Sequence, residues 1–143
     1  YASLGAGTSQ EVMQAIDIYK QGSATWVGMH CVSSYPVASD SANLPRLNFL
    51  RERCPIIGLS DHTTSIIAPA LAVALGVRVI EKHFTTDHDL PGRDNKFAMV
   101  PKDFRQMVDA IQEAEELLID HGIEALAIES DTMTNYRGRW GSN

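Results

Sequence analysis

The chain of 143 residues carries a formal net charge of −6, with 44% hydrophobic and 21% charged residues. This length and composition are typical of one globular domain, and the negative charge argues against a nucleic-acid partner, which selects a basic surface. No apolar run approaches the roughly 18 residues of a membrane span, so we expect no membrane association. Cys31 and Cys54 follow no secretory signal, which predicts reduced thiols and a cytoplasmic protein.

The first predicted element is the end of a strand that leaves into a glycine-rich turn. The chain begins at Tyr1 and reaches Ser-Leu-Gly-Ala-Gly at residues 3–7, which indicates a fragment whose first strand starts upstream. Residues 8–11, Thr-Ser-Gln-Glu, have the form of a capping box. The helix that follows carries Val12, Ile16 and Tyr19 on one face and is expected to stop near Gly22.

Three further helices and three further strands alternate along the rest of the chain. Apolar runs predict strands over about 26–32, 56–60 and 77–83, and helical spacing predicts helices over about 43–53, 66–75 and 101–122. The expected buried stripe of the last helix consists of Phe104, Met107, Val108, Ile111 and Leu118. Residues 123–143 are polar and predicted to be a tail or linker, and we expect their aromatic and basic segment 136–140 to dock on a neighbouring surface.

This alternation predicts an α/β fold with a parallel sheet. A strand–helix–strand unit makes consecutive strands parallel and adjacent, because the crossover returns the chain to the same edge. The predicted strands are continuous apolar runs, which is the pattern of strands covered on both faces.

Two histidines stand at the ends of the last two predicted strands. They lie in Ser-Asp-His-Thr at residues 60–63 and in Glu-Lys-His-Phe-Thr at residues 81–85. Because side chains alternate along a strand, Ser60 shares a face with His62, and Glu81 shares a face with His83. Two imidazoles on adjacent strand ends suggest a shared ion such as Mn, Fe, Zn or Co. A single histidine in such a position is more often a hydrogen-bonded structural group, so the spacing leaves both interpretations open.

These segments closely resemble the sialic acid synthases. The resemblance lies in Ser-Asp-His-Thr, in Ala-Val-Ala-Leu-Gly-Val-Arg-Val-Ile-Glu-Lys-His-Phe-Thr and in Leu-Pro-Gly-Arg-Asp. The turn at residues 3–8 and His-Cys-Val-Ser-Ser-Tyr-Pro at residues 30–36 also resemble family segments. The family condenses phosphoenolpyruvate with N-acetylmannosamine or a related amino sugar.

The resemblance implies a fold and partners. It implies that residues 1–122 are the C-terminal half of a (β/α)₈ TIM barrel, from the end of strand five through strand eight, with residues 123–143 as a tail. It also implies phosphoenolpyruvate and an amino sugar as substrates, a divalent metal (Mn²⁺ or Mg²⁺) as cofactor, and a homodimer.

The resemblance assigns roles residue by residue. His62 and His83 match the metal-binding histidines, and Asp94 matches the aspartate of the Pro-Gly loop that contacts the sugar. The other matched residues are expected to bind substrates: Ser3, Ser34, Tyr35, Ser60 and Lys96. The chain departs from the family in the acceptor-side loop, where Asp-Asn-Lys-Phe-Ala replaces Asp-His-Lys-Ala-Ser, and where Arg93 replaces a proline. We also expect Ser34 to stand where the family has asparagine.

Two alternatives use the same residues. A non-catalytic barrel fragment would act as a binding or assembly module, because half a barrel exposes sheet edges that seek a partner. A metal-dependent hydrolase on the same fold is the other alternative, since fold alone does not decide function. The hydrolase would need further His or Asp ligands, and His30 is expected to lie too deep to serve.

Overall fold

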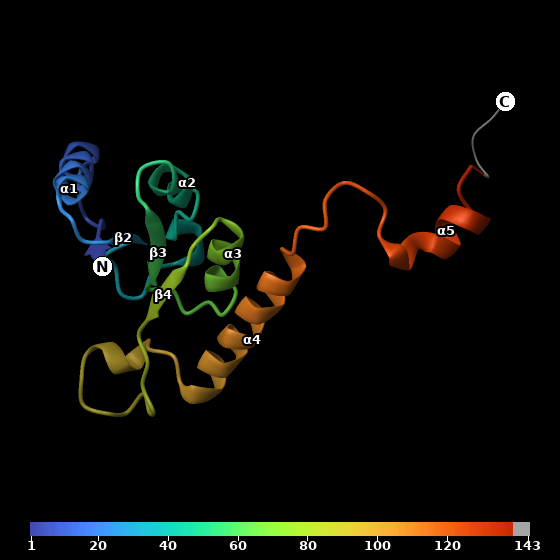
Figure 1. The fold of residues 1–143 in the computed structure, drawn as a ribbon. Coiled ribbons are helices and arrows are strands. Elements are labelled where there is room, and N and C mark those ends of the chain that lie inside the picture. The colour runs from blue at the N-terminus through green and yellow to red at the C-terminus, as the bar shows by residue number, and fades with distance from the viewer. Residues whose placement is uncertain (139–143) are drawn as a thin grey trace.

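The computed structural model describes residues 1–138 and shows a parallel four-stranded sheet with helices between the strands (Figure 1). The strands are β1 (Ala2–Ser3), β2 (Val27–Cys31), β3 (Ile56–Asp61) and β4 (Val79–Lys82), and they are ordered in the sheet as in the chain. All three pairings are parallel. The predicted α/β fold with a parallel sheet is confirmed.

Four helices accompany this sheet: α1 (Ser9–Gln21), α2 (Arg46–Arg51), α3 (Ala68–Ala74) and α4 (Pro101–Leu117). The capping box at the start of α1 is present as predicted, with Thr8 accepting from the Glu11 N–H and Glu11 accepting from the Thr8 N–H. Residues 1–138 also include three short 3₁₀ turns, η1 (Ser39–Ser41), η2 (Asp94–Lys96) and η3 (Ala127–Glu129).

Two helix boundaries differ from the prediction. The second helix was expected from about residue 43, but Asn43 adopts a left-handed backbone with φ of 48°, which excludes it from the helix. Pro45 caps α2 at its N-terminus, and the helix begins at Arg46. The last long helix ends at Leu117, not near residue 122, and Leu118 is half exposed instead of lying on the buried stripe. Met107 is the buried centre of that stripe.

The hydrophobic core lies between the sheet and the helices. Its centre is formed by Ile16 of α1 and Leu47 and Leu50 of α2, which have no exposed surface. Ile57 and Leu59 contribute from β3. Because side chains alternate along a strand, Ser60 and the residues that share its face of β3 point away from this core, to the opposite face of the sheet. The fold therefore separates a packed helix side from a second face, on which the predicted site residues lie.

The C-terminal part of the described chain forms a short helix that the sequence analysis did not predict. This helix, α5 (Ser130–Asn135), follows η3, and Figure 1 shows both apart from the sheet. Residues 123–138 are exposed. Docking of residues 136–140 stays a prediction, since Arg139 and Trp140 lie outside the described residues. None of the helices within residues 1–138 combines the length and the apolar character needed to cross a membrane.

Candidate functional site

The ends of β3 and β4 bring the two predicted histidines together. Ser60 is the register partner of Glu81, and the Ser60 hydroxyl donates to Glu81 Oε1 at 2.6 Å. The same hydroxyl oxygen lies 3.2 Å from His62 Nε2. The rings of His62 and His83 have centroids 5.4 Å apart. The predicted adjacency and the shared face of these side chains are confirmed.

The hydrogen bonds of His62 define which ring nitrogen faces the site. Its Nδ1 lies 2.8 Å from the carbonyl oxygen of Val32, which can only accept, so Nδ1 carries the hydrogen. The single hydroxyl hydrogen of Ser60 is donated to Glu81. In the neutral imidazole, Nε2 therefore carries a lone pair on the side of the ring that faces Ser60. An N–H to carbonyl bond on the far nitrogen is the usual way in which a metal-binding histidine is oriented.

The spacing of the two rings fits a shared ion. An ion about 2.1 Å from one nitrogen of each ring, at a tetrahedral or octahedral angle, would separate the centroids by about 5 Å. The observed 5.4 Å agrees with this value. Within residues 1–138 no group of three or more His, Cys, Asp or Glu side chains is arranged to hold a metal. The two imidazoles could thus serve as a pair of metal ligands, and such a site would leave open positions for substrate or water.

Two aromatic side chains enclose the histidines. The Tyr35 ring lies 4.4 Å from the His62 centroid and 5.7 Å from that of His83. The loop that carries Tyr35 is attached at the end of β3, because the Val37 N–H donates to the carbonyl of His62 at 2.9 Å. The Phe97 ring lies 5.2 Å from His83 and 6.0 Å from Tyr35, so it packs beside Tyr35 against the second imidazole. The sequence analysis named Phe97 only as a departure from the family pattern, and its position against His83 follows from the fold of the long loop before α4.

The loop residues Asp94 and Lys96 differ in their relation to this cluster. Asp94 reaches it, with Oδ2 3.8 Å from His83 Nδ1, and its side chain is 59% exposed. Lys96 is exposed and lines a separate small cavity together with Thr64, His88 and Phe97. Only Asn95 lies between them in η2, yet Asp94 approaches His83 while Lys96 lines the other cavity.

The predicted serines also fall into two groups. Ser3 of β1 lies on the face of the site, and its hydroxyl is 3.1 Å from Cys31 Sγ. Cys31 is the register partner of Ser60, so a row of polar side chains runs across the sheet from Ser3 to Glu81. Ser34 is exposed and bonds only weakly to the Pro36 carbonyl, at 3.5 Å.

Sequence reasoning missed Cys31 and Ser33 as members of this face. The Ser33 hydroxyl lies 3.9 Å from Cys31 Sγ, and a Cβ added to Gly5 would meet both side chains. Period-two alternation from His30 would have indicated them, because His30 faces the helices and is fully buried.

The opposite face of the same strands carries a buried ion pair. Lys82 Nζ lies 2.6 Å from Asp61 Oδ2, and both side chains are 3% exposed. Period-two alternation places both residues on the helix side of the sheet, but the pairing of Asp61 with Lys82 is visible only in the tertiary structure.

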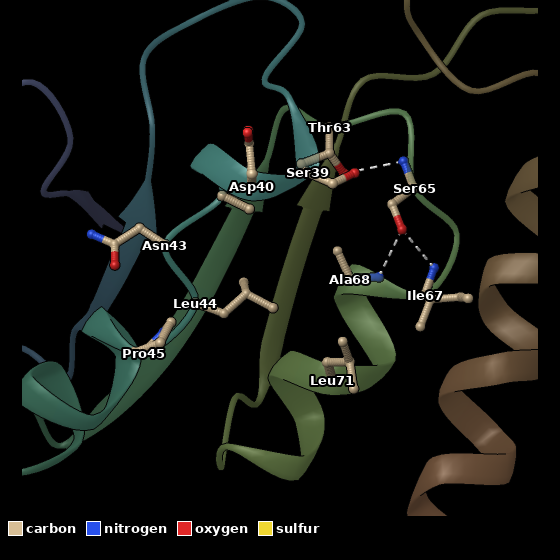
Figure 2. Close-up of a pocket in the computed structure, with 11 residues that line it drawn as sticks. Ser39, Asp40, Asn43, Leu44, Pro45, Thr63, Ser65, Ile67, Ala68 and Leu71 are labelled. Carbon is tan, nitrogen blue, oxygen red and sulfur yellow. Dashed lines mark hydrogen bonds between the residues drawn. The ribbon is translucent and has the colours of Figure 1, made fainter.

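A cavity of about 530 Å³ lies on the helix side, between the segment from η1 to Pro45 and the start of α3. Figure 2 shows Leu44 and Leu71 on its walls, and the Ser65 hydroxyl accepting from the backbone N–H groups of Ile67 and Ala68. Of the described residues that line it, none is a predicted site residue. It is separate from the histidine cluster.

Comparison with known proteins gives the site a family. The chain is 40% identical, over 82% of its length, to a pseudaminic acid synthase of Campylobacter jejuni. It is also 40% identical, over 81% of its length, to an N,N'-diacetyllegionaminic acid synthase of Legionella pneumophila. It covers 35% and 34% of these two proteins and therefore spans about a third of the length of the curated relatives it matches.

A solved structure agrees with these relatives. The N-acetylneuraminic acid synthetase from Leptospira borgpetersenii superposes with a TM-score of 0.81 at 34% sequence identity, covering 92% of this chain and 47% of that chain. The model of the NeuB family matches residues 1–122. Since this match takes in the whole sheet, the histidine cluster and α4, the chain belongs to the NeuB family.

Proposed function

We propose that the protein carrying this chain condenses phosphoenolpyruvate with an N-acylated sugar aldehyde, N-acetylmannosamine or a relative, giving a nonulosonic acid and phosphate. Family membership and the names of the relatives, synthases of pseudaminic, legionaminic and N-acetylneuraminic acids, support it. The His62–His83 pair on the open face of the sheet is the single observation that carries it.

The same proposal includes the C-terminal half of a (β/α)₈ barrel. Two features of the fold support this. The strands are all parallel and follow chain order, and β1 and β4 stand at the two edges of the sheet. The helix side is packed while the opposite face carries polar side chains, as the inner face of a barrel does at the carboxyl ends of its strands.

His62 and His83 would hold Mn²⁺ or Mg²⁺, and the bound ion would polarise the aldehyde oxygen of the acceptor sugar as a Lewis acid. The Val32 carbonyl keeps the His62 ring in the tautomer that presents Nε2. Tyr35 and Phe97 pack on the two imidazoles and restrict their ring orientations and the access of water. Asp94, beside His83 and exposed, is placed to accept from a sugar hydroxyl.

The terminal enol carbon of phosphoenolpyruvate attacks the aldehyde carbon of the sugar. Water then adds to the phosphoenolpyruvate carbon that bears the phosphate, and phosphate leaves by cleavage of the bond between that carbon and the phosphate oxygen. Ser3 and Ser60 stand in the polar row across the sheet, on the side where phosphoenolpyruvate would bind. The Ser3 hydroxyl would donate to an anionic group of phosphoenolpyruvate, and the Ser60 hydroxyl would do so only after giving up its hydrogen bond to Glu81. Lys96 and Ser34, at the rim of the loops, would contact the substrates only from outside the histidine cluster. The homodimer expected from the family stays a prediction.

Replacement of His62 tests the proposal. In the intact protein with Mn²⁺, phosphoenolpyruvate and a panel of hexosamine acceptors, His62→Ala is expected to lower phosphate release at least about 100-fold, because one of two imidazole ligands is lost. Removal of the metal with a chelator should have the same effect, and Mn²⁺ should restore the rate of the unsubstituted protein only.

The matched control is His121→Ala, since His121 is an exposed histidine beyond the end of α4. Its rate should equal that of the unsubstituted protein. An unchanged rate in His62→Ala would contradict the role of the histidine pair. Absence of phosphate release with every acceptor would favour the binding-module alternative.

A further inference from the structure

The register of β3 and β4 stops one residue short of the two histidines. The last paired residues of these strands are Asp61 and Lys82, so His62 and His83 lie beyond the backbone ladder. The hydrogen bonds of the sheet therefore do not by themselves determine how far apart the two imidazoles stand. Another contact between the two chain segments must do so.

The buried pair of Asp61 and Lys82 supplies that contact. The Lys82 ammonium donates to Asp61 Oδ2 and to the backbone carbonyls of Thr63 and Ser65, the latter at 3.3 Å. An ammonium has three N–H donors, and all three are used here. One side chain of β4 is thereby bonded to the last residue of β3 and to two points on the segment that follows it.

Asp61 completes the link from the other side. Its carboxylate accepts from the Thr63 N–H at 2.9 Å and from the Thr63 hydroxyl at 3.1 Å. The Thr63 hydroxyl in turn accepts from the Ser65 N–H (Figure 2). Asp61 and Thr63, the residues on either side of His62, are thus held by one hydrogen-bond network. Lys82, the residue before His83, is the cation of that network.

The cost of such a pair argues for a geometric role. A buried ion pair contributes little net stability compared with apolar side chains of the same volume, because both charges lose their hydration. Both Asp61 and Lys82 are 3% exposed, and the remaining polar atoms around them are hydrogen-bonded. A network that is fully satisfied restricts the local backbone to one arrangement.

We propose that Asp61 and Lys82 are a positioning pair that sets the separation of the His62 and His83 imidazoles from the helix side of the sheet. The positioning role rests on the proposed synthase function only for the identity of the ion that the two rings would share. The distance between the rings can be measured without any ion.

Three variants of the intact protein test it. Lys82→Met removes the cation and keeps the length of the side chain, while the double variant Asp61→Asn with Lys82→Met removes both charges and leaves no unpaired charge buried. The matched control is Arg105→Met with Asp109→Asn, which removes an exposed ion pair on α4. Each variant is measured for the NOE between the His62 and His83 ring protons, for Mn²⁺ affinity by EPR, and for its urea midpoint.

We expect Lys82→Met to lose the NOE between the rings, to weaken Mn²⁺ binding at least about tenfold, and to lower the urea midpoint. The double variant should recover most of the urea midpoint but neither the NOE nor the Mn²⁺ affinity. The Arg105–Asp109 control should match the unsubstituted protein in all three measurements.

A double variant with the NOE and an Mn²⁺ affinity within twofold of the unsubstituted protein would overturn the proposal, since the pair would then act through stability alone. A double variant that fails to fold would equally assign the pair to folding and overturn it. If the unsubstituted protein shows the NOE but binds no Mn²⁺, the proposed metal site is wrong. The positioning role is then supported if the double variant loses the NOE and contradicted if the double variant keeps it.

Discussion

At the scale of single residues, His30 and His62 show how the surroundings of a histidine decide its chemistry. His30 has no exposed surface, its Nε2 donates to the Ala42 carbonyl at 2.9 Å, and its Nδ1 has no partner among the described residues. The Nδ1 of His62 also lies beside a carbonyl, but its Nε2 is 3.2 Å from the Ser60 hydroxyl, on the face of the sheet that carries His83. The surroundings of His30 are those of a structural histidine, and the role of His62 as a metal ligand stays a proposal.

Burial of His30 predicts an acid-sensitive fold. Burial lowers the pKa of His30 below its ordinary value, and the bond to Ala42 offsets this only in part. The unfolded chain takes up a proton near pH 6.5 while the folded chain resists it, so this stability is present above about pH 6.5 and is lost as the pH falls. The urea midpoint should therefore decrease between pH 7.5 and 5.5, and less steeply in His30→Gln than in the unsubstituted protein.

The control for this measurement is His121→Gln, because His121 is exposed and should leave the pH dependence of the urea midpoint unchanged. Equal slopes for His30→Gln and the unsubstituted protein would show that protonation of His30 is not coupled to unfolding.

At the scale of elements, the central strand β3 depends on a glycine. A Cβ added to Gly58 would lie 2.2 Å from Met29 Sδ and 3.0 Å from the Val79 carbonyl oxygen. The Val79 contact is to backbone of the neighbouring strand, which cannot move aside without disturbing the sheet. The apolar run predicted the strand, but the need for glycine within it follows from the two strands packed on either side.

Gly58→Ala is expected to lower the free energy of unfolding by about 1–3 kcal/mol, because the added methyl group overpacks the sheet. Urea unfolding measures this directly. Gly22→Ala is the matched control, since the nearest atom to its added Cβ is at 3.4 Å, an ordinary contact. Equal losses in the two variants would contradict the overpacking.

At the scale of the whole molecule, the packed part of the chain is the sheet with its four helices, and the described residues after α4 are exposed. The segment 119–126 lies between α4 and η3, and its hydrogen bonds are local. The Gly122 and Leu126 N–H groups donate to nearby exposed carboxylates, and the Ile119 N–H donates to the Glu116 carbonyl. Segments with few buried contacts open at low free-energy cost. This segment is therefore the expected weak point of the backbone.

Thermolysin, which cuts before large apolar residues, should make its first cuts before Ile119, Ile123 or Leu126. Mass spectrometry of the early fragments identifies the sites. Trypsin serves as the control, because the sequence has no Lys or Arg between Arg105 and Arg137 and offers it no site in this segment. First thermolysin cuts within β2 or β3 would contradict the expected order of stability.

The sequence by itself determined the order of elements, the parallel sheet and the shared face of Ser60, His62 and Glu81. These features depend on local periodicity and on the connection rule for parallel strands, both of which can be recognised in one sequence. The family motif could also be recognised, since its residues are contiguous. The start of α2 was placed less well, because the left-handed Asn43 leaves no periodic signal. The end of α4 was also placed less well.

Only the tertiary structure decided which distant residues meet the two histidines. Phe97 against His83, Cys31 beside Ser3, and Asp61 on Lys82 join segments that lie in different elements. Such contacts depend on the path of the loops and on the stagger of the strands, and neither is encoded in a local pattern of residues. The same reason explains why Ser33 was not expected on this face: a shift of one residue at the exit of a strand changes the face on which a side chain lies.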